Sequence, residues 1–291
     1  MIIIILVLTK IGDVSINRNS VKIMGILNLS PESFYKNSIK INLNSISSYV
    51  KKLEEDGADI IDIGAMSTAP YLNTITSSQV EILRLKKAIK IIRKSCQLPL
   101  SVDTPRAKVA EEAIMMGANA INDVCGLKYD PEMASIVSKY SIPVIVGAYE
   151  KNPSTILTAK SFSTKKILND SITIAQNAGI KKTNIIIDPS IGFFRKEGNN
   201  PFFTKITKIP WYRRDIEIIS NLKELTKLYF PICISLSNKS FLGQLMNLRV
   251  NERRIPSLIM EVIAVMNGAT VIRTHNVKET VLALDTLQLL G

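Results

Sequence analysis

The stretch LPLSVDTPRAKVAEEAIMMGANAINDV, residues 98–124, contains one complete repeat of the organisation that runs through this chain. It begins with a short apolar run, 98–104. A helix-like segment follows, with Pro105 at its start and Gly117 at its end, and a second apolar run, 120–124, comes next. Proline suits the first turn of a helix and glycine suits its C-terminal end. The stretch therefore predicts a strand, a helix and another strand.

The same unit recurs along the whole chain of 291 residues. Most of the apolar runs are continuous rather than alternating, as expected of parallel strands covered on both faces. The runs are VKIMGIL (21–27), ADIIDIG (58–64), LPLSVDT (98–104), AINDV (120–124), PVIVGA (143–148), NIIIDPS (184–190), PICISLS (231–237) and TVIRTH (270–275). Eight such units predict an α/β fold, a (β/α)8 TIM barrel. A doubly wound open sheet is the alternative, but it usually has fewer strands and often a glycine-rich first turn, which is missing here.

No linker rich in Pro, Gly or Ser divides the chain, so residues 1–291 are predicted to form a single domain with an N-terminal strand or hairpin segment at 1–20. Residues 2–8 are apolar, but they are too few to span a bilayer and do not resemble a signal peptide. We interpret them as a starting strand and expect no membrane association. The irregular stretch 193–215 is long enough to suggest a functional or mobile loop.

The chain has 37 Lys and Arg against 25 Asp and Glu, a formal charge of +12. The basic residues are spread out, and no helix combines them densely with aromatic residues, so we expect no nucleic-acid binding and interpret them mainly as a lysine-rich surface. Attraction of a small polyanionic substrate is the other interpretation. The cysteines Cys96, Cys125 and Cys233 lack metal-ligand spacing and favour a reducing cytoplasm.

Polar side chains collect where the apolar runs end, which in a TIM barrel is the face that carries the active site. They are Asn28, Thr68, Asp103, Asn122, Asp123, Asp188, Ser237, Lys239, Arg273 and His275, the only histidine. Carboxylates and amides can pair with the N–H groups of a flat heterocycle such as an aminopyrimidinone. Lysine and arginine suit a ring carbonyl or a phosphate. The set therefore predicts one pocket for a heterocycle and an anion.

Several of these residues have a structural alternative. Asp103 could be the N-cap of the helix that follows it. Either Asn122 or Asp123 could serve only to hold a loop, and Asp188, which precedes a proline, could cap a turn. His275 could be an interior histidine of an apolar strand. The sequence leaves these alternatives open.

Taken in order, the motifs of the chain resemble those of the dihydropteroate synthases, members of the pterin-binding enzyme superfamily. They are IMGILNLSPESF (23–34), GADIIDIGAMST (57–68), SVDTPRAKVAEEAIMMGANAINDVCG (101–126), IIIDPSIGF (185–193), SNKSFLG (237–243) and VIRTHNVKET (271–280). The resemblance implies a transferase of folate biosynthesis that joins an aromatic amine, usually p-aminobenzoate, to 6-hydroxymethyl-7,8-dihydropterin diphosphate and releases pyrophosphate with Mg²⁺. It also implies a cytoplasmic homodimer formed through helices near the C-terminus.

The resemblance assigns a role to each matching position. Asn28 would help to hold the Mg²⁺ and the diphosphate. Lining of the pterin pocket would fall to Thr68, Asp103, Asn122, Asp188 and Lys239, with Phe193 close by. Arg273 and His275 would bind the diphosphate, and Arg273 would also lie over the pterin ring. Catalysis would then depend on Lys239, Arg273 and His275.

The chain departs from the family pattern around the expected acceptor site. Ala69 and Asn238 stand where the family usually has arginine. The first loop and the fifth strand also differ, at residues 35–38 and 147–149. These changes weaken the case for ordinary p-aminobenzoate and favour a modified arylamine, unless Arg106, Arg195 or the segment 249–254 supplies the cation.

Two other functions remain open at this stage. A pterin-dependent methyltransferase shares the barrel, but it releases no diphosphate and is expected to lack the SNKSF and RTH motifs that are present here. A pterin-binding homologue without synthase activity is the second alternative, and the changes at Ala69 and Asn238 are its support.

Overall fold

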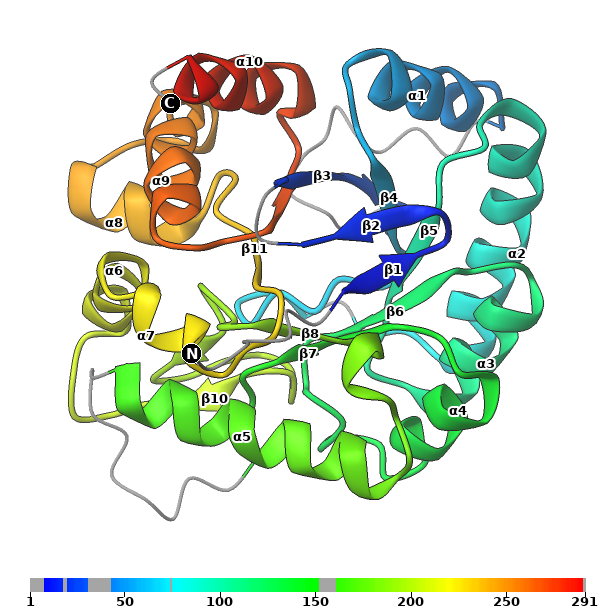
Figure 1. Ribbon diagram of the computed structural model, residues 1–291, viewed down its shortest axis with the longest axis horizontal. Coiled ribbons are helices and arrows are strands. Elements are labelled where there is room, and N and C mark those ends of the chain that lie inside the picture. The colour runs from blue at the N-terminus through cyan, green and yellow to red at the C-terminus, as the bar shows by residue number, and fades with distance from the viewer. Residues whose placement is uncertain (1–7, 18–19, 31–42, 74, 152–160, 290–291) are drawn as a thin grey trace, which may run out of the picture.

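The eight predicted strands form one parallel barrel in the computed structural model, which describes residues 8–17, 20–30, 43–73, 75–151 and 161–289 (Figure 1). The strands are β3 (Lys22–Asn28), β4 (Ile60–Gly64), β5 (Leu100–Asp103), β6 (Ala120–Asp123), β7 (Val144–Gly147), β8 (Ile185–Asp188), β11 (Cys233–Ile234) and β12 (Val271–Thr274). They follow the order β11-β12-β3-β4-β5-β6-β7-β8, and a bridge between Ile187 and Ile232 joins the two ends. The predicted single-domain (β/α)8 TIM barrel is confirmed, and the open sheet is excluded.

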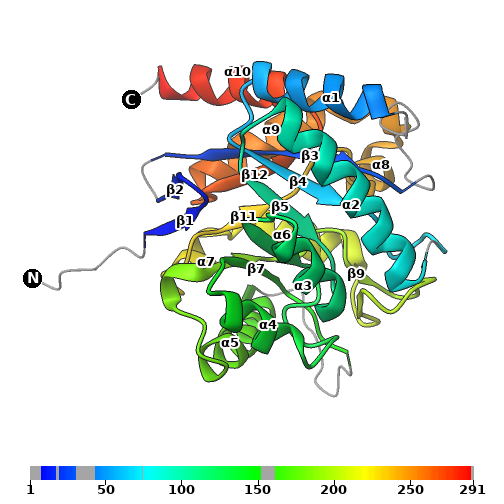
Figure 2. The same cartoon turned by 90° about the vertical axis from the view of Figure 1, so that its right-hand side faces the viewer.

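Helices surround the strands on the outside of the barrel (Figure 2). They are α1 (Leu43–Glu55), α2 (Ser78–Ser95), α3 (Ala107–Met115), α4 (Met133–Tyr140), α5 (Ser161–Asn177), α6 (Trp211–Ser220), α7 (Lys223–Thr226), α8 (Ser240–Met246), α9 (Arg254–Met266) and α10 (Val277–Gln288). A glycine with positive φ follows three of them, α1, α3 and α9. Gly57, Gly117 and Gly268 have φ of +96°, +100° and +101°. A residue with a Cβ rarely adopts this left-handed conformation, so glycine lets the chain turn from helix to strand.

The start of one helix differs from the prediction. α3 begins at Ala107, so Pro105 lies before the helix and not in its first turn. The carboxylate of Asp130 accepts a hydrogen bond from the Ala107 amide at 2.8 Å. A side chain from the following unit therefore satisfies this helix start, a contact that the local sequence does not contain.

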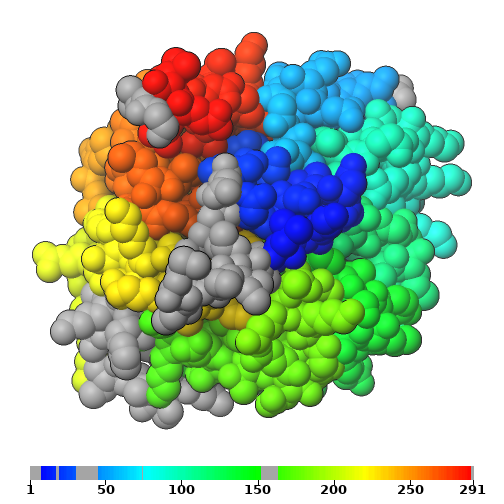
Figure 3. Space-filling view, viewed as in Figure 1, coloured from blue at the N-terminus to red at the C-terminus, as the bar shows by residue number. Residues whose placement is uncertain are grey.

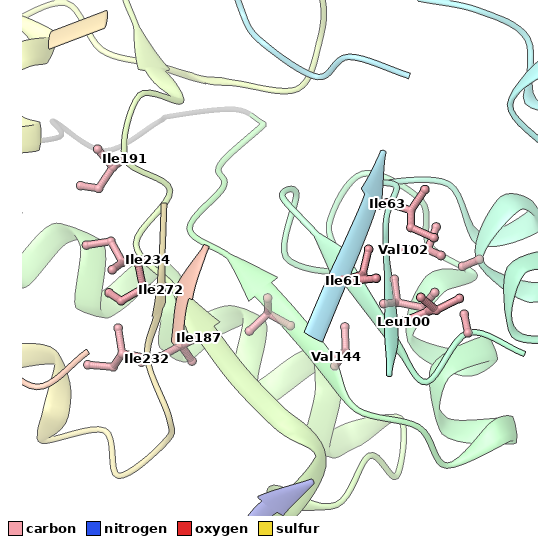
Figure 4. Close-up of a cluster of buried hydrophobic side chains, with 14 of the residues drawn as sticks. Ile61, Ile63, Leu100, Val102, Val144, Ile187, Ile191, Ile232, Ile234 and Ile272 are labelled. Atoms are coloured by element: carbon pink, nitrogen blue, oxygen red, sulfur yellow. The ribbon is translucent and has the colours of Figure 1, made fainter. Parts of the chain in front are cut away.

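Two apolar layers arise because successive side chains of a strand point to opposite faces. Ile61 and Ile63 of β4, with Leu100 and Val102 of β5, belong to the layer between strands and helices (Figure 4). Ile60 of β4 belongs to a separate cluster inside the barrel. The inner layer lies near the amino ends of the strands, and it leaves the carboxyl ends for polar residues.

A hairpin closes the amino end of the barrel. Its strands β1 (Thr9–Ile11) and β2 (Val14–Ile16) pair antiparallel, and Figure 3 shows the hairpin in dark blue on this face. Ile11 and Ile16 are fully buried against the inner layer, which consists of Met24, Ile60, Ala120, Ile145, Ile186, Cys233 and Val271. Apolar side chains of the hairpin and the strands therefore close the amino end of the barrel. Residues 2–7, most of the predicted starting strand, lie outside the described residues.

The stretch 193–215 is more ordered than its sequence suggested. It contains β9 (Phe194–Arg195) and β10 (Thr204–Lys205), which pair in parallel, and the first turn of α6. Short 3₁₀ turns at Lys182–Asn184 and Val250–Glu252 complete the elements. None of the helices that the structure describes combines the length and the apolar character needed to cross a bilayer.

Candidate active site

The polar residues of the site lie two positions beyond the inner apolar layer, on the same strands. This spacing keeps both residues on the inner face of the barrel. The pairs are Ile60 and Asp62, Ala120 and Asn122, Ile186 and Asp188, and Val271 and Arg273. The same alternation that buries the apolar layer therefore aims carboxylates, an amide and a guanidinium into the mouth of the barrel.

Arg273 forms ion pairs with two carboxylates from other strands. Its Nε lies 2.6 Å from Asp62 Oδ2, and its Nη2 lies 2.9 Å from Asp103 Oδ2. Asn122 Nδ2 donates to the same Asp62 oxygen at 3.2 Å. Asp62 is fully buried and was not among the predicted site residues. The signal for it was a carboxylate within the apolar run ADIIDIG, at an inward position two residues before the strand ends.

The structure decides between the alternatives for Asp103. Its Oδ2 binds Arg273, while its Oδ1 is buried and accepts no hydrogen bond from any described residue. Asp103 is therefore not the N-cap of α3. Burial raises the pKa of its carboxyl group to about 7, against the opposing effect of Arg273, and Asp62 adds to the rise. An unpartnered acceptor in a buried pocket is costly unless a ligand donates to it.

The neighbouring pair of β6 divides the two roles that the sequence left open. Asp123 accepts hydrogen bonds from the amides of Cys125 and Leu127 at 2.8 and 2.7 Å, so it holds the loop after the strand. Asn122 instead lines a small inner cavity of about 30 Å³. That cavity is also lined by Asp103, Asp188, Phe193, Lys239 and Arg273. The inner cavity therefore brings six of the predicted site residues together.

Asp188 caps a turn and also lines the inner cavity. Its Oδ1 accepts from the Ser190 amide at 2.6 Å, which caps the turn after β8, and its side chain also lines the inner cavity. Burial raises its pKa, and the charges of Lys239 and Arg273 oppose the rise. Burial and the charge of Arg273 lower the pKa of Lys239 to about 8. The Lys239 Nζ lies 5.1 Å from the centroid of the Phe193 ring, so cation, carboxylate and aromatic face share one wall.

A larger cavity of about 360 Å³ continues from the inner one to the surface. It is lined by Asn28, Thr68, Ser237 and His275, the remaining predicted residues, and it shares Asp103, Lys239 and Arg273 with the inner cavity. Burial, with the charges of Arg273 and Lys239, lowers the pKa of His275 to about 3. The imidazole is therefore neutral at pH 7 in the free protein.

Two of the arginines considered for the acceptor end of the site lie there, and a third does not. Arg106 pairs with Glu81 at 3.0 Å, so it does not replace a lost arginine. Arg195 and Arg253 both line the larger cavity, next to Ala69 and Asn238. Further out, Arg213 and Arg249 are exposed and do not line it. Residues 35–38 of the first loop lie outside the described residues.

The loop after β4 is held by the stretch between β9 and β10. Asn200, which is 6% exposed, donates from Nδ2 to the carbonyl oxygens of Ala69 and Leu72 at 2.7 and 3.3 Å. The Asn199 amide donates to Pro70 O at 2.7 Å. One wall of the larger cavity is therefore fixed by residues about 130 positions away along the chain.

Comparison with known proteins identifies relatives over most of the chain. Residues 24–275 match the family model described as pterin binding enzyme. The chain is 37% identical over 275 residues to a dihydropteroate synthase of Clostridium beijerinckii, covering 93% of this chain and 94% of that protein. It is 32% identical over 259 residues to a dihydropteroate synthase of Bacillus subtilis, covering 88% and 84%.

Solved structures agree with these matches. A dihydropteroate synthase of Coxiella burnetii in complex with pteroic acid superposes with a TM-score of 0.81 at 33% identity, covering 97% of each chain. A dihydropteroate synthase of Xanthomonas albilineans with 4-aminobenzoic acid gives a TM-score of 0.83 at 27% identity, covering 98% of each chain.

Proposed function

The chain belongs to the pterin binding enzyme family and is a dihydropteroate synthase-like transferase, and we propose that it couples a dihydropterin diphosphate to an aromatic amine through the two connected cavities. In this reaction the amine nitrogen forms a bond to the methylene carbon of the pterin. The carbon–oxygen bond to the diphosphate breaks, pyrophosphate leaves and the amine loses a proton. Pteroic acid and 4-aminobenzoic acid are bound by the similar structures, which supports the same substrate classes here.

The observation that carries the proposal is the inner cavity. Its walls hold the Asp103 and Asp188 carboxylates, the Asn122 amide and the Lys239 ammonium group, and Asp103 Oδ1 is buried without a described donor. An aminopyrimidinone edge offers adjacent N–H donors for carboxylates and a carbonyl that accepts from lysine. The pterin ring would therefore enter the carboxylate end and direct its methylene group toward the larger cavity.

The diphosphate would lie in the larger cavity, near Arg273 and His275. Arg273 is held by Asp62 and Asp103, so it presents a fixed guanidinium instead of a mobile one. His275 is neutral in the free protein and would gain a proton beside an anion, because negative charge favours the protonated ring. Both residues would thus hold the leaving group, and Lys239 would hold the ring.

Magnesium is proposed to enter with the diphosphate. The Asn28 side chain lines the cavity and would supply one neutral oxygen ligand. No group of three His, Cys, Asp or Glu side chains forms a metal site in the described part of the chain. Mg²⁺ commonly binds through few protein ligands, with phosphate oxygens and water completing its octahedron, so the residues present fit a substrate-borne ion.

A homodimer is proposed from the surface of α9 and α10. Ile255, Ile259 and Met266 of α9 are 70%, 54% and 62% exposed, and Leu282 of α10 is 57% exposed. Such a group of large apolar side chains is unusual on a free surface and suits contact with a second copy. A cytoplasmic location is also proposed, because the three cysteines are free thiols.

Steady-state pyrophosphate release tests the function. The purified protein is given pterin diphosphate, Mg²⁺ and p-aminobenzoate, and we expect release that depends on all three. A methyltransferase would release no pyrophosphate, and a binding protein without synthase activity would bind the pterin in calorimetry but show no turnover. A phosphorylated ribosyl-aniline in place of p-aminobenzoate tests the modified arylamine.

A further inference from the structure

Arg195 places a buried guanidinium group in the wall of the larger cavity. It is 7% exposed, and its Cζ lies 3.4 Å from the centroid of the Trp211 ring, which holds the plane of the group. Its Nη2 donates to Ser240 Oγ at 2.6 Å. Its Nη1 is buried and donates to no acceptor among the described residues. A buried charged donor without a partner is costly, so this atom marks a place for an acceptor from outside the chain.

The nearest carboxylate does not fill that place. Asp215 contributes a favourable charge to Arg195, but its Oδ2 accepts from the Gly192 amide at 3.0 Å and its Oδ1 pairs with Arg214 at 3.2 Å. No ion pair joins Asp215 to Arg195 among the described contacts. The negative charge of Asp215 therefore partly offsets the charge of Arg195, but Nη1 of Arg195 still has no acceptor among the described residues.

The other arginine next to Ala69 and Asn238 is Arg253, and it binds the backbone. Arg253 Nε and Nη2 donate to Leu248 O at 3.2 and 3.1 Å, and its Nη1 donates to Asn238 O at 3.4 Å. These bonds tie Arg253, which directly follows the 3₁₀ turn Val250–Glu252, to the loops on either side of α8. Of the two arginines next to Ala69 and Asn238, Arg195 is the one with a buried nitrogen that has no acceptor among the described residues.

A glycine lies between Arg195 and Lys239. Gly192 has φ of +87° and lines the larger cavity. A Cβ placed there would lie 3.7 Å from Lys239 Nζ and 3.9 Å from Arg195 Nη2. Both side chains therefore lie within contact distance of the same point above Gly192, on the wall of one cavity. An acceptor that reacts beside Lys239 would lie close to Arg195.

We propose that Arg195 binds the anionic group of the acceptor amine and takes over the role of the arginines that are absent at Ala69 and Asn238. This inference rests on the proposed transferase function. Nη1 donates to a carboxylate oxygen of the acceptor. Ser240 Oγ accepts from Nη2, so its own hydrogen is left to donate to the same carboxylate. Arg195 is then the residue that selects a para-carboxylate over a neutral amine.

The test compares p-aminobenzoate with p-aminobenzamide, which has nearly the same shape but no charge. Pyrophosphate release is measured with both amines for the wild type, Arg195→Met and the matched control Arg213→Met, whose arginine is exposed on α6. Arg195→Met should raise KM for p-aminobenzoate by about 10- to 100-fold, since it removes a charge-assisted hydrogen bond. KM for p-aminobenzamide and the affinity for pterin diphosphate should change little, and Arg213→Met should match the wild type.

Equal changes in KM for the two amines, or no change, would overturn the role of Arg195. If Arg195→Met does not fold, Arg195→Lys keeps the charge but loses the planar fork. It should then lower the preference for the carboxylate several-fold, and an unchanged preference would refute the proposal. Failure of the transferase function would be seen separately, as wild-type protein that releases no pyrophosphate with any amine.

Discussion

At the scale of single residues, the site depends on carboxylates that are buried and only partly satisfied. Asp188 is the clearest case, because one of its oxygens caps the turn after β8 and the side chain still lines the inner cavity. Asp188→Ala should weaken pterin binding by about 30- to 1,000-fold, corresponding to roughly 2–4 kcal/mol for charge-assisted hydrogen bonds in a dry pocket. Calorimetry with hydroxymethylpterin measures the loss. The control is Asp285→Ala on the exposed side of α10, which should bind normally. Unchanged affinity in folded Asp188→Ala would remove this residue from the site.

His275 gives a second prediction at this scale, since it is the only histidine of the chain. Burial and the nearby charges of Arg273 and Lys239 lower its pKa to about 3, so its NMR signal should not titrate between pH 5 and 8 in the free protein. Pyrophosphate with Mg²⁺ should raise this pKa, because the anion favours the imidazolium form. A signal that titrates near pH 6.5 without ligand would contradict the buried environment. A signal that ignores the anion would separate His275 from the diphosphate site.

At the scale of elements, α9 is fastened to α10 through a buried carboxyl group. Glu261 is 1% exposed, and its Oε2 accepts from Thr280 Oγ1 at 2.7 Å, while Oε1 has no described donor. Burial raises its pKa from 4.5 to about 7, against the hydrogen bonds from Thr280 and Thr274. The folded state therefore binds more protons than the unfolded state between these two values. The stabilising effect of the protonated group is complete below pH 4.5 and is lost as pH rises to 7.

Glu261→Gln should remove this part of the pH dependence. The wild type should lose on the order of 3 kcal/mol more than the variant between pH 4.5 and pH 8, from the change in the pKa of Glu261. Urea unfolding midpoints at pH 5 and pH 8 measure the difference. Glu55→Gln on the exposed face of α1 serves as the control and should keep the wild-type dependence. If the free energy of unfolding changed equally with pH in the wild type and in Glu261→Gln, Glu261 would ionise normally in the folded protein.

At the scale of the whole molecule, the barrel presents one closed and one open end, and its last helices carry an apolar surface. Ile255 and Ile259 are four residues apart on α9, and Met266 follows seven residues later, so they share a face of the helix. Ile259→Asp should shift the protein from dimer to monomer in light scattering, because a charge at the centre of an apolar contact is not solvated. Leu83→Asp, at an exposed leucine of α2, should leave the mass unchanged. A wild-type protein that is monomeric at micromolar concentration would contradict the dimer.

The sequence by itself determined the strands, the glycine after α3 and most of the residues that line the two cavities. These features depend on spacing within a few residues. Continuous apolar runs define the buried parallel strands, and the period of two places Asn122, Asp188 and Arg273 on the inner face. Each family motif is likewise a short continuous segment of the sequence. For that reason the barrel could be predicted. Of the predicted residues, Asn28 and Thr68 line the larger cavity, and Phe193 and Lys239 line both.

Only the tertiary structure decided which charges meet. Asp62 and Arg273 are 211 positions apart, and only closure of the barrel places them 2.6 Å from each other. Closure also assigned Asp103 to Arg273 instead of to a helix cap, and Arg106 to Glu81 instead of to the acceptor site. The surroundings of the unpartnered Nη1 of Arg195 likewise come from separate parts of the chain, namely Trp211, Ser240 and Gly192. Local periodicity sets the face on which a side chain lies, but ion pairing depends on distances across the barrel that no short segment contains.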